Sequence, residues 1–341
     1  AMVDNDPSLK GKFVEVRNAL YGAAQSPRAF NKHLHARLQS YGWKQSLADP
    51  CMYVRHDADG SRSFVCIYVD DVLMIGDPDH VKQFVQKLDI ATNPSSGFKI
   101  RNYGIPSSFL GMEIKRTGHK VKISQTEYIK KMAASCGITG PDFPITPLPP
   151  GIKVDKYVRD SPPADSTEFR SIIGQLLYAV HICRPDAAQP VHALSRHLHE
   201  PTEAGIKLAR QVVAYLLGTS EVGLTYDGAR PIPLHGYSDA DWAGDLTTRR
   251  STSGYVFMRN NAAISWQSIL QRTVAHSTSD AEYRALSEAG REALFLRNLE
   301  TAITGKKLSD RTVLFEDNRG AQKWSGDAAN HSKTKHVEIC Y

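Results

Sequence analysis

The stretch Phe64-Val-Cys-Ile-Tyr-Val-Asp-Asp-Val-Leu-Met-Ile-Gly76 decides how the first part of the chain folds. Its apolar residues occupy both faces of two short predicted strands, and Asp70 and Asp71 stand side by side where the strands join. Two neighbouring carboxylates repel each other, so holding both ionised against apolar strands requires a cation such as a divalent metal bound by oxygen ligands. The alternative is a solvated turn, because aspartate is also a common turn residue.

A second set of acids lies near the end of the chain. The segment His235-Gly-Tyr-Ser-Asp-Ala-Asp-Trp-Ala-Gly-Asp245 predicts a short strand with acids at its end, and Asp239 is the first candidate ligand. Ser277-Thr-Ser-Asp-Ala-Glu-Tyr-Arg-Ala-Leu286 opens a predicted helix whose apolar stripe includes Glu282. A carboxylate on such a stripe needs either a buried arginine or a metal. Asp317 closes the apolar strand Thr312-Val-Leu-Phe-Glu-Asp-Asn318, where a strand end delivers a side chain to a cleft.

Prolines and periodicity divide the chain into three parts. Five prolines fall between Pro141 and Pro150, and neither a helix nor a strand runs through such spacing. The part before them alternates strands and helices, whereas residues 166–218 are predicted to be mostly helical, with Thr202 as an N-cap. Short strands, one long helix, another strand and a last helix are predicted from Pro233 onward. This pattern predicts a separate α/β unit at the end of the chain and agrees with an α+β fold class.

Composition bounds the classes of protein that the chain can be. It has 341 residues, 41% hydrophobic and 23% charged, which predicts a folded protein of two or three domains. The longest apolar run is split by two aspartates, and no secretory leader precedes it, so we expect an intracellular protein without a membrane span. The five cysteines form no C-x-x-C pair and indicate neither a disulfide framework nor structural zinc. A formal net charge of +6 permits, without requiring, binding to nucleic acid.

Tyr68-Val-Asp-Asp71 resembles the catalytic hairpin of reverse transcriptases, and its surroundings resemble those of copia-type LTR retrotransposon Pol polyproteins. Ala19-Leu-Tyr-Gly-Ala-Ala-Gln-Ser-Pro-Arg-Ala-Phe30 is similar to the motif of that family that contacts template and nucleotide. Phe109-Leu-Gly-Met-Glu-Ile114 is similar to its primer-grip neighbourhood, and Phe169 to Tyr178 follows its helical thumb. The nucleic-acid contacts that the resemblance implies in this part are Gln25, Ser26, Pro27, Arg28, Tyr68 and Gly111.

The resemblance implies a polymerase site with two Mg²⁺ ions, for which Mn²⁺ is a substitute, held by Asp70, Asp71 and a third aspartate from an earlier strand. Residues 1–18 offer no such strand, because Asp4 and Asp6 sit in a polar segment. The fingers of the polymerase are also not matched. We therefore expect this chain by itself to polymerise DNA poorly or not at all.

The last part resembles the ribonuclease H domain of copia elements. Besides the acids, it matches at Thr248-Arg-Arg-Ser-Thr-Ser-Gly-Tyr-Val-Phe257 and His331-Ser-Lys-Thr-Lys-His-Val-Glu-Ile339. The resemblance implies two Mg²⁺ ions bound by Asp239, Glu282 and Asp317, which serve cleavage of the RNA strand of an RNA/DNA hybrid. It also implies Glu338 as a fourth metal ligand in place of the usual aspartate, His336 as a helper in proton transfer or product release, and Arg249 and Arg250 as phosphate contacts. Asp241 and Asp245 are expected to be solvated or to support the ligands from outside, and His197 and His199 to be surface residues.

The implied architecture has three domains: a partial palm with an antiparallel sheet (1–118), a largely helical thumb and connection (119–228), and a mixed five-stranded ribonuclease H-like domain (229–341). The implied partners are an RNA template, a DNA primer, an RNA/DNA hybrid, and other Pol or Gag segments. By analogy the location is a cytoplasmic virus-like particle, with the nucleus as an alternative. The competing hypothesis is a catalytically inactive nucleic-acid-binding or interaction module derived from a retrotransposon.

Overall fold

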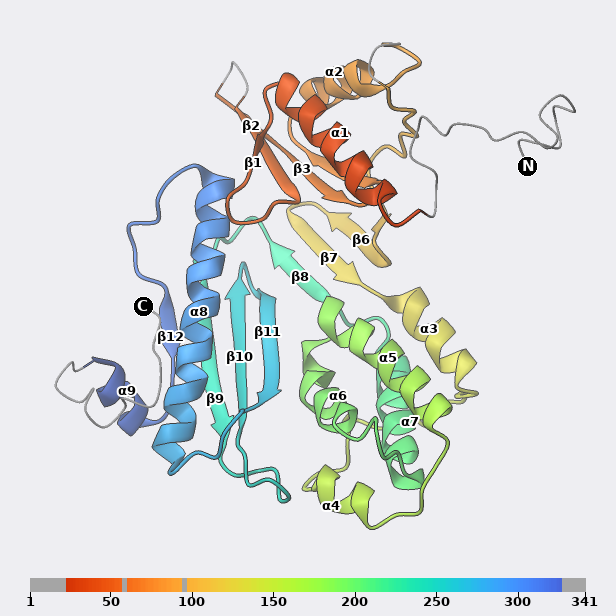
Figure 1. Ribbon diagram of the computed structural model, residues 1–341, viewed down its shortest axis with the longest axis vertical. Coiled ribbons are helices and arrows are strands. Elements are labelled where there is room, and N and C mark those ends of the chain that lie inside the picture. The colour runs from red at the N-terminus through yellow and green to blue at the C-terminus, as the bar shows by residue number, and fades with distance from the viewer. Residues whose placement is uncertain (1–22, 57–59, 94–96, 327–341) are drawn as a thin grey trace, which may run out of the picture. The chain divides into compact units, whose positions relative to one another are not determined.

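The computed structural model describes residues 23–56, 60–93 and 97–326. The chain divides into two compact units, Ala1–Tyr103 with Asn298–Lys307, and Gly104–Arg297 with Leu308–Tyr341. No helix among the described residues is both long enough and apolar enough to cross a membrane. Figure 1 labels the helices and strands of both units.

The first unit is a four-stranded antiparallel sheet accompanied by two helices. Its elements are α1 (Ser26–Ser40), β1 (Lys44–Gln45), β2 (Met52–His56), β3 (Arg62–Tyr68), β4 (Asp71–Ile75) and α2 (Pro78–Leu88), and the strand order is β1-β2-β3-β4. Alternate residues of β3 are buried, and Val65 and Ile67 join Leu34, Leu38 and Phe84 in one apolar core. Burial of one face of the sheet fixes the register of the strands.

The predicted hairpin is confirmed. β3 and β4 pair antiparallel, with Tyr68 opposite Asp71, so Val69 and Asp70 make the turn. Val69 has φ 56°, a left-handed conformation that a β-branched residue rarely adopts. No glycine marks this turn, and the adjacent aspartates between two apolar runs are what indicate it in the sequence.

The second unit begins with an antiparallel sheet and a helical bundle. The sheet has the order β5-β6-β7-β8, formed by β5 (Ser108–Phe109), β6 (Met112–Thr117), β7 (Lys120–Ser124) and β8 (Leu224–Asp227). The helices are α3 (Thr126–Ser135), α4 (Val154–Arg159), α5 (Ser166–Ile182), η2 (Pro185–Ala187), α6 (Ala188–Ser195) and α7 (Glu203–Gly218). Thr202 caps α7 as predicted, because its hydroxyl accepts a hydrogen bond from the Gly205 amide.

A second sheet and residues 278–297 of a long helix complete this unit. The elements are β9 (His235–Asp241), β10 (Thr252–Arg259), β11 (Ala262–Leu270), α8 (Thr278–Thr304), β12 (Val313–Phe315) and α9 (Arg319–Gly326). The strand order is β11-β10-β9-β12, antiparallel except for the parallel pair of β9 and β12, so the sheet is mixed as predicted. Within the described residues it has four strands rather than the predicted five.

Helix α8 lies along one face of this sheet (Figure 1). Phe257, Ala289, Ala293 and Leu296 form the buried layer between them. Gly236 lies beneath this layer, where a Cβ atom would come within 2.6 Å of the Phe257 ring. A larger residue at position 236 would therefore push α8, including its first turns, away from the sheet.

Candidate carboxylate site

Three acids of the second sheet and α8 converge. Asp239, Glu282 and Asp317 each offer a carboxylate oxygen, and these oxygens lie within 4.8 Å of one another. Within the described ranges, this is the single group of three or more histidine, cysteine, aspartate or glutamate side chains that is close enough to share a metal ion. These are three of the four metal ligands that the resemblance implies, and the fourth, Glu338, lies outside the described residues.

The parallel pair of strands explains the meeting of the two aspartates. Phe315 of β12 lies in register with Tyr237 of β9, and Asp317 and Asp239 each follow two residues later. Parallel strands deliver their carboxyl ends to the same edge of a sheet, so both side chains reach one place. Both aspartates are exposed, which leaves them free to face a ligand in solution.

Glu282 reaches this place from the start of α8. The helix start is fixed because Asp280 accepts a hydrogen bond from the His276 amide (2.8 Å) and pairs with Arg284 (2.9 Å). The Asp280 amide in turn donates to the Ser277 hydroxyl (3.1 Å). From this helix start, a carboxylate oxygen of Glu282 lies within 4.8 Å of those of both aspartates.

Glu282 is the energetically unusual member of the set. Its side chain is 6% exposed, and its Oε2 atom is buried without a hydrogen-bond partner in the described part of the chain. Burial raises the pKa of Glu282 to about 7, and the charges of Glu316, Asp239 and Asp317 add to the rise, against the hydrogen bond from the Ala240 amide. An orphaned buried carboxylate oxygen among three other acids needs a cation. Oxygen donors of this kind suit a hard divalent ion, so the residues present fit Mg²⁺ or Mn²⁺.

Glu316 belongs to the site and was missed in the sequence. It is 9% exposed, accepts hydrogen bonds from the Ser238 hydroxyl (2.8 Å) and the Asn318 amide (3.0 Å), and burial raises its pKa. Its hydrogen bonds hold the strand end that carries Asp317. Strand alternation could have indicated it, because two adjacent acids at a strand end must point to opposite faces.

The loop between β9 and β10 carries the basic residues expected to contact phosphate. Asp245 is 5% exposed and accepts hydrogen bonds from the Thr247 and Thr248 amides (both 2.9 Å), so it is a buried loop support rather than a solvated acid. Asp241 is exposed, in line with the expectation. Arg249 is exposed and Arg250 half-buried at the end of this loop, and their role in phosphate binding stays a prediction.

The hairpin acids of the first unit are differently placed. Asp70, Asp71 and Tyr68 are all exposed, Tyr68 by 59%. No third acidic, histidine or cysteine side chain joins this pair at metal-binding distance in the parts of the chain that the structure describes.

The remaining predicted site residues lie at the start of α1, between β5 and β6, or outside the described residues. Gln25, Ser26, Pro27 and Arg28 form the start of α1. Gly111, at φ 71°, turns the chain between β5 and β6 against Tyr178, whose hydroxyl donates to the Leu110 carbonyl (2.7 Å). His336 and Glu338 lie outside the described residues.

The chain is similar to known proteins over almost its whole length. The reverse transcriptase (RNA-dependent DNA polymerase) family matches residues 2–150. The retrovirus-related Pol polyprotein from transposon TNT 1-94 of Nicotiana tabacum is 32% identical over 336 residues, 96% of this chain and 24% of that protein. The corresponding polyprotein from transposon RE1 of Arabidopsis thaliana is 33% identical over 96% of this chain and 22% of its own length.

This chain therefore spans about a quarter of those polyproteins. A putative transposon Ty5-1 protein of Saccharomyces cerevisiae is of more similar size, 30% identical over 80% of this chain and 87% of its own length. Together with the hairpin geometry, these matches show that the chain belongs to the copia-type, retrovirus-related Pol polyproteins and carries a reverse transcriptase domain of that family.

Proposed function

We propose that this chain is a metal-dependent nuclease that hydrolyses the RNA strand of RNA/DNA hybrids. The observation that carries the proposal is the buried, unpartnered Oε2 atom of Glu282 between two exposed aspartates. A carboxylate with a purely structural role would be expected to pair with an arginine, as Asp280 does, or to accept hydrogen bonds from amides, as Asp245 does. The resemblance of this part of the chain to copia ribonuclease H supports the same reading.

The exposed aspartates and the buried glutamate have different proposed roles. Asp239 and Asp317 face the solvent side and would hold metal and substrate phosphate together, whereas Glu282 would hold metal from the buried side. Bound divalent ions in such sites lower the pKa of water and stabilise the charge that develops on the phosphate. The fixed start of α8 and the hydrogen bonds of Glu316 keep the three carboxylates in place without substrate.

The proposed substrate is a hybrid duplex, recognised by shape. Proteins read such duplexes through phosphates and 2′-hydroxyls rather than through base edges. Arg249 and Arg250, in the loop that follows β9, are proposed to contact phosphate. We also infer that the Pol polyproteins named above process template and primer strands with their reverse transcriptase region, which makes a hybrid the expected product.

We propose that polymerase activity, in contrast, requires more carboxylates than the two of the hairpin in the first unit. Asp70 and Asp71 supply two carboxylates, and in-line phosphoryl transfer with two metal ions needs further oxygen ligands. The nuclease is thus the better supported activity of the two for this chain.

The proposal is tested with a labelled RNA/DNA hybrid and purified protein in Mg²⁺. The wild type should cleave the RNA strand, and Asp239→Asn and Glu282→Gln should each lower the rate by at least a hundredfold, as removal of electrostatic groups in active sites does (roughly 10²–10³). Glu288→Gln is the matched control, because Glu288 is a half-buried acid of the same helix whose carboxylate is paired with Arg291. A folded wild type that binds hybrid and leaves it intact would instead identify an inactive binding module.

A further inference from the structure

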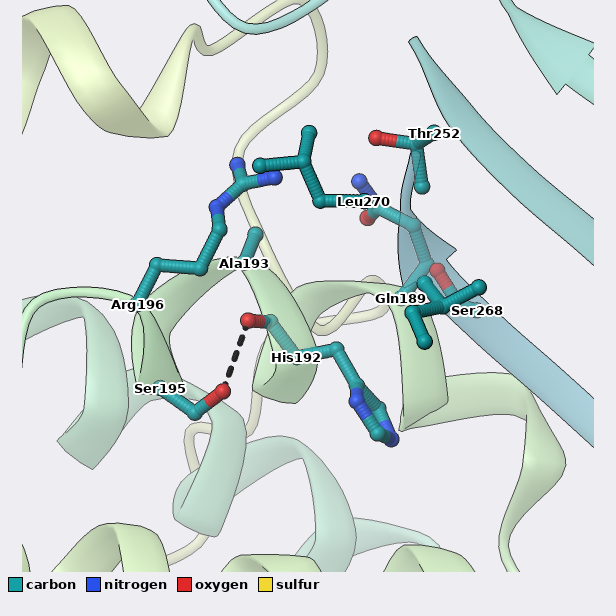
Figure 2. Close-up of a pocket in the computed structure, with 9 residues that line it drawn as sticks. Gln189, His192, Ala193, Ser195, Arg196, Thr252, Ser268 and Leu270 are labelled. Atoms are coloured by element: carbon teal, nitrogen blue, oxygen red, sulfur yellow. Dashed lines mark hydrogen bonds between the residues drawn. The ribbon is translucent and has the colours of Figure 1, made fainter. Parts of the chain in front are cut away.

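A cavity that the proposed nuclease does not use lies between α4 and the start of α7. Its volume is about 580 Å³, larger than the two cavities beside α6, of about 220 and 320 Å³, the first of which Figure 2 shows. Its apolar walls are the side chains of Ile152, Tyr157, Pro162 and Ala204. A cavity of this volume with such walls is typical of sites that accept a ligand or one large side chain.

Hydrogen bonds hold the walls of this cavity in place without a ligand. The Ala204 amide of α7 donates to the hydroxyl of Ser161, which also lines the cavity (3.0 Å). The Thr202 hydroxyl, before α7, donates to the Val158 carbonyl of α4 (2.8 Å). These bonds tie α4 and the loop that follows it to the start of α7, so a partner meets a surface that is already formed.

The opposite side of α4 is anchored to the end of α6. Asp155 is buried and binds the guanidinium of Arg196 (3.0 Å) and the imidazole of His197 (2.9 Å). His197 is therefore half-buried rather than the surface residue that the sequence predicts. Figure 2 shows Arg196 extending from the end of α6. With Asp155 turned toward α6, the next two residues, Lys156 and Tyr157, are left exposed.

The rim of the cavity is basic. Lys153 and Lys156 both line the cavity and are exposed, against a single acid in the lining, Asp160. Within the described residues, neither lysine is paired with an acidic side chain. Tyr157 lies on the same side of α4 and is 41% exposed. The rim therefore offers two ammonium groups beside an apolar hollow, an arrangement that attracts a partner carrying negative charge.

We infer that this cavity binds an acidic segment of another protein, with one aromatic or aliphatic side chain in the cavity and carboxylates against Lys153 and Lys156. The apolar walls fit such an anchoring side chain, and the two ammonium groups complement neighbouring carboxylates. A nucleic acid fits less well, because single strands are held by successive aromatic rings, and Tyr157 is the one aromatic ring of this lining. The inference does not depend on the proposed nuclease activity.

The probe is a fluorescein-labelled heptapeptide in which one phenylalanine stands between two runs of three glutamates. Its binding to the full chain is followed by fluorescence anisotropy at low salt. Lys156→Glu should weaken binding about three- to thirtyfold, because it replaces an attraction by a repulsion of similar size. Tyr157→Ala should weaken it about tenfold, because it removes one apolar wall. Lys131→Glu makes the same charge change at an exposed lysine of α3 outside the lining, and should leave binding within about twofold of wild type. Unchanged melting temperatures of the variants show that the losses do not come from unfolding.

Two altered peptides separate the apolar and the charged part of the site. Alanine in place of the phenylalanine should weaken binding about tenfold, and a peptide with glutamines in place of the glutamates should no longer distinguish Lys156→Glu from wild type. Equal losses in Lys156→Glu and Lys131→Glu would indicate unspecific attraction to a basic surface and overturn the inference. An absence of saturable binding by the folded chain would overturn it as well. A heptauridylate that displaces the peptide and loses affinity in Lys156→Glu and Tyr157→Ala would overturn it in favour of a nucleic-acid site.

Discussion

Replacing Glu282 by glutamine should remove a pH-dependent destabilisation of the metal-free protein. The pKa of Glu282 is raised to about 7 in the folded chain, mainly by burial, against an ordinary value of 4.5. The folded state therefore holds this proton more tightly than the unfolded state, and wild-type stability falls as pH rises between those two values. Integrated from pH 5 to pH 8, the loss amounts to about 2–3 kcal/mol, and the glutamine variant does not suffer it.

The assay is urea unfolding in EDTA at pH 5 and pH 8, followed by tryptophan fluorescence of the second unit. The glutamine variant should gain stability relative to wild type as the pH rises. The difference between their free energies of unfolding should increase by about 2–3 kcal/mol from pH 5 to pH 8. The control Glu288→Gln, an acid of the same helix that is paired with Arg291, should show no such change. Excess Mg²⁺ should then stabilise wild type, by about 2.7 kcal/mol at a hundred times Kd, and leave Glu282→Gln unchanged. A constant difference between variant and wild type across this pH range would refute the reasoning.

Three other substitutions probe the scaffold. Asp155→Asn should lower the free energy of unfolding by about 1–3 kcal/mol at pH 7. Burial raises the pKa of Asp155, but the hydrogen bond from His197 and the nearby Arg196 guanidinium outweigh burial and hold this pKa below its usual value. The wild type should therefore lose stability on acidification below about pH 4. In chemical denaturation the variant should not show this loss, because it lacks the carboxylate. Gly236→Val should destabilise the second unit by at least 1–3 kcal/mol, since any Cβ there meets the Phe257 ring; an unchanged melting temperature would contradict this packing. Tyr283→Phe should be neutral or stabilising in the same melts, because the buried Tyr283 hydroxyl has no hydrogen-bond partner in the described residues, and a loss above 1 kcal/mol would reveal a hidden partner.

The local sequence predicts the elements well where acids interrupt apolar runs. The hairpin at Asp70 and Asp71 and the helix start before Glu282 follow from patterns a few residues long. The meeting of Asp239 with Asp317 depends on the parallel pairing of β9 with β12, which no local pattern contains and which only the family resemblance supplied.

The features that were missed are those set by distant contacts. Glu316 is buried where the Ser238 hydroxyl of another strand donates a hydrogen bond to its carboxylate, and Asp245 is buried where loop amides donate to its own. His197 is held by Asp155, 42 residues earlier in the chain. Whether a polar side chain is buried depends on which distant residue forms a hydrogen bond or ion pair with it, and sequence periodicity does not contain that information.

Product chemistry tests the central claim most directly. A hybrid carrying a 5′-labelled RNA strand is incubated with wild-type protein in Mg²⁺, in EDTA, and with Asp317→Asn in Mg²⁺, and the ends of the RNA fragments are identified. Attack by water at the carboxylate site leaves 3′-hydroxyl and 5′-phosphate ends, produced only by wild type with metal. Fragments ending in 2′,3′-cyclic phosphate, or cleavage that persists in EDTA or in Asp317→Asn, would show that the three carboxylates are not the catalytic site.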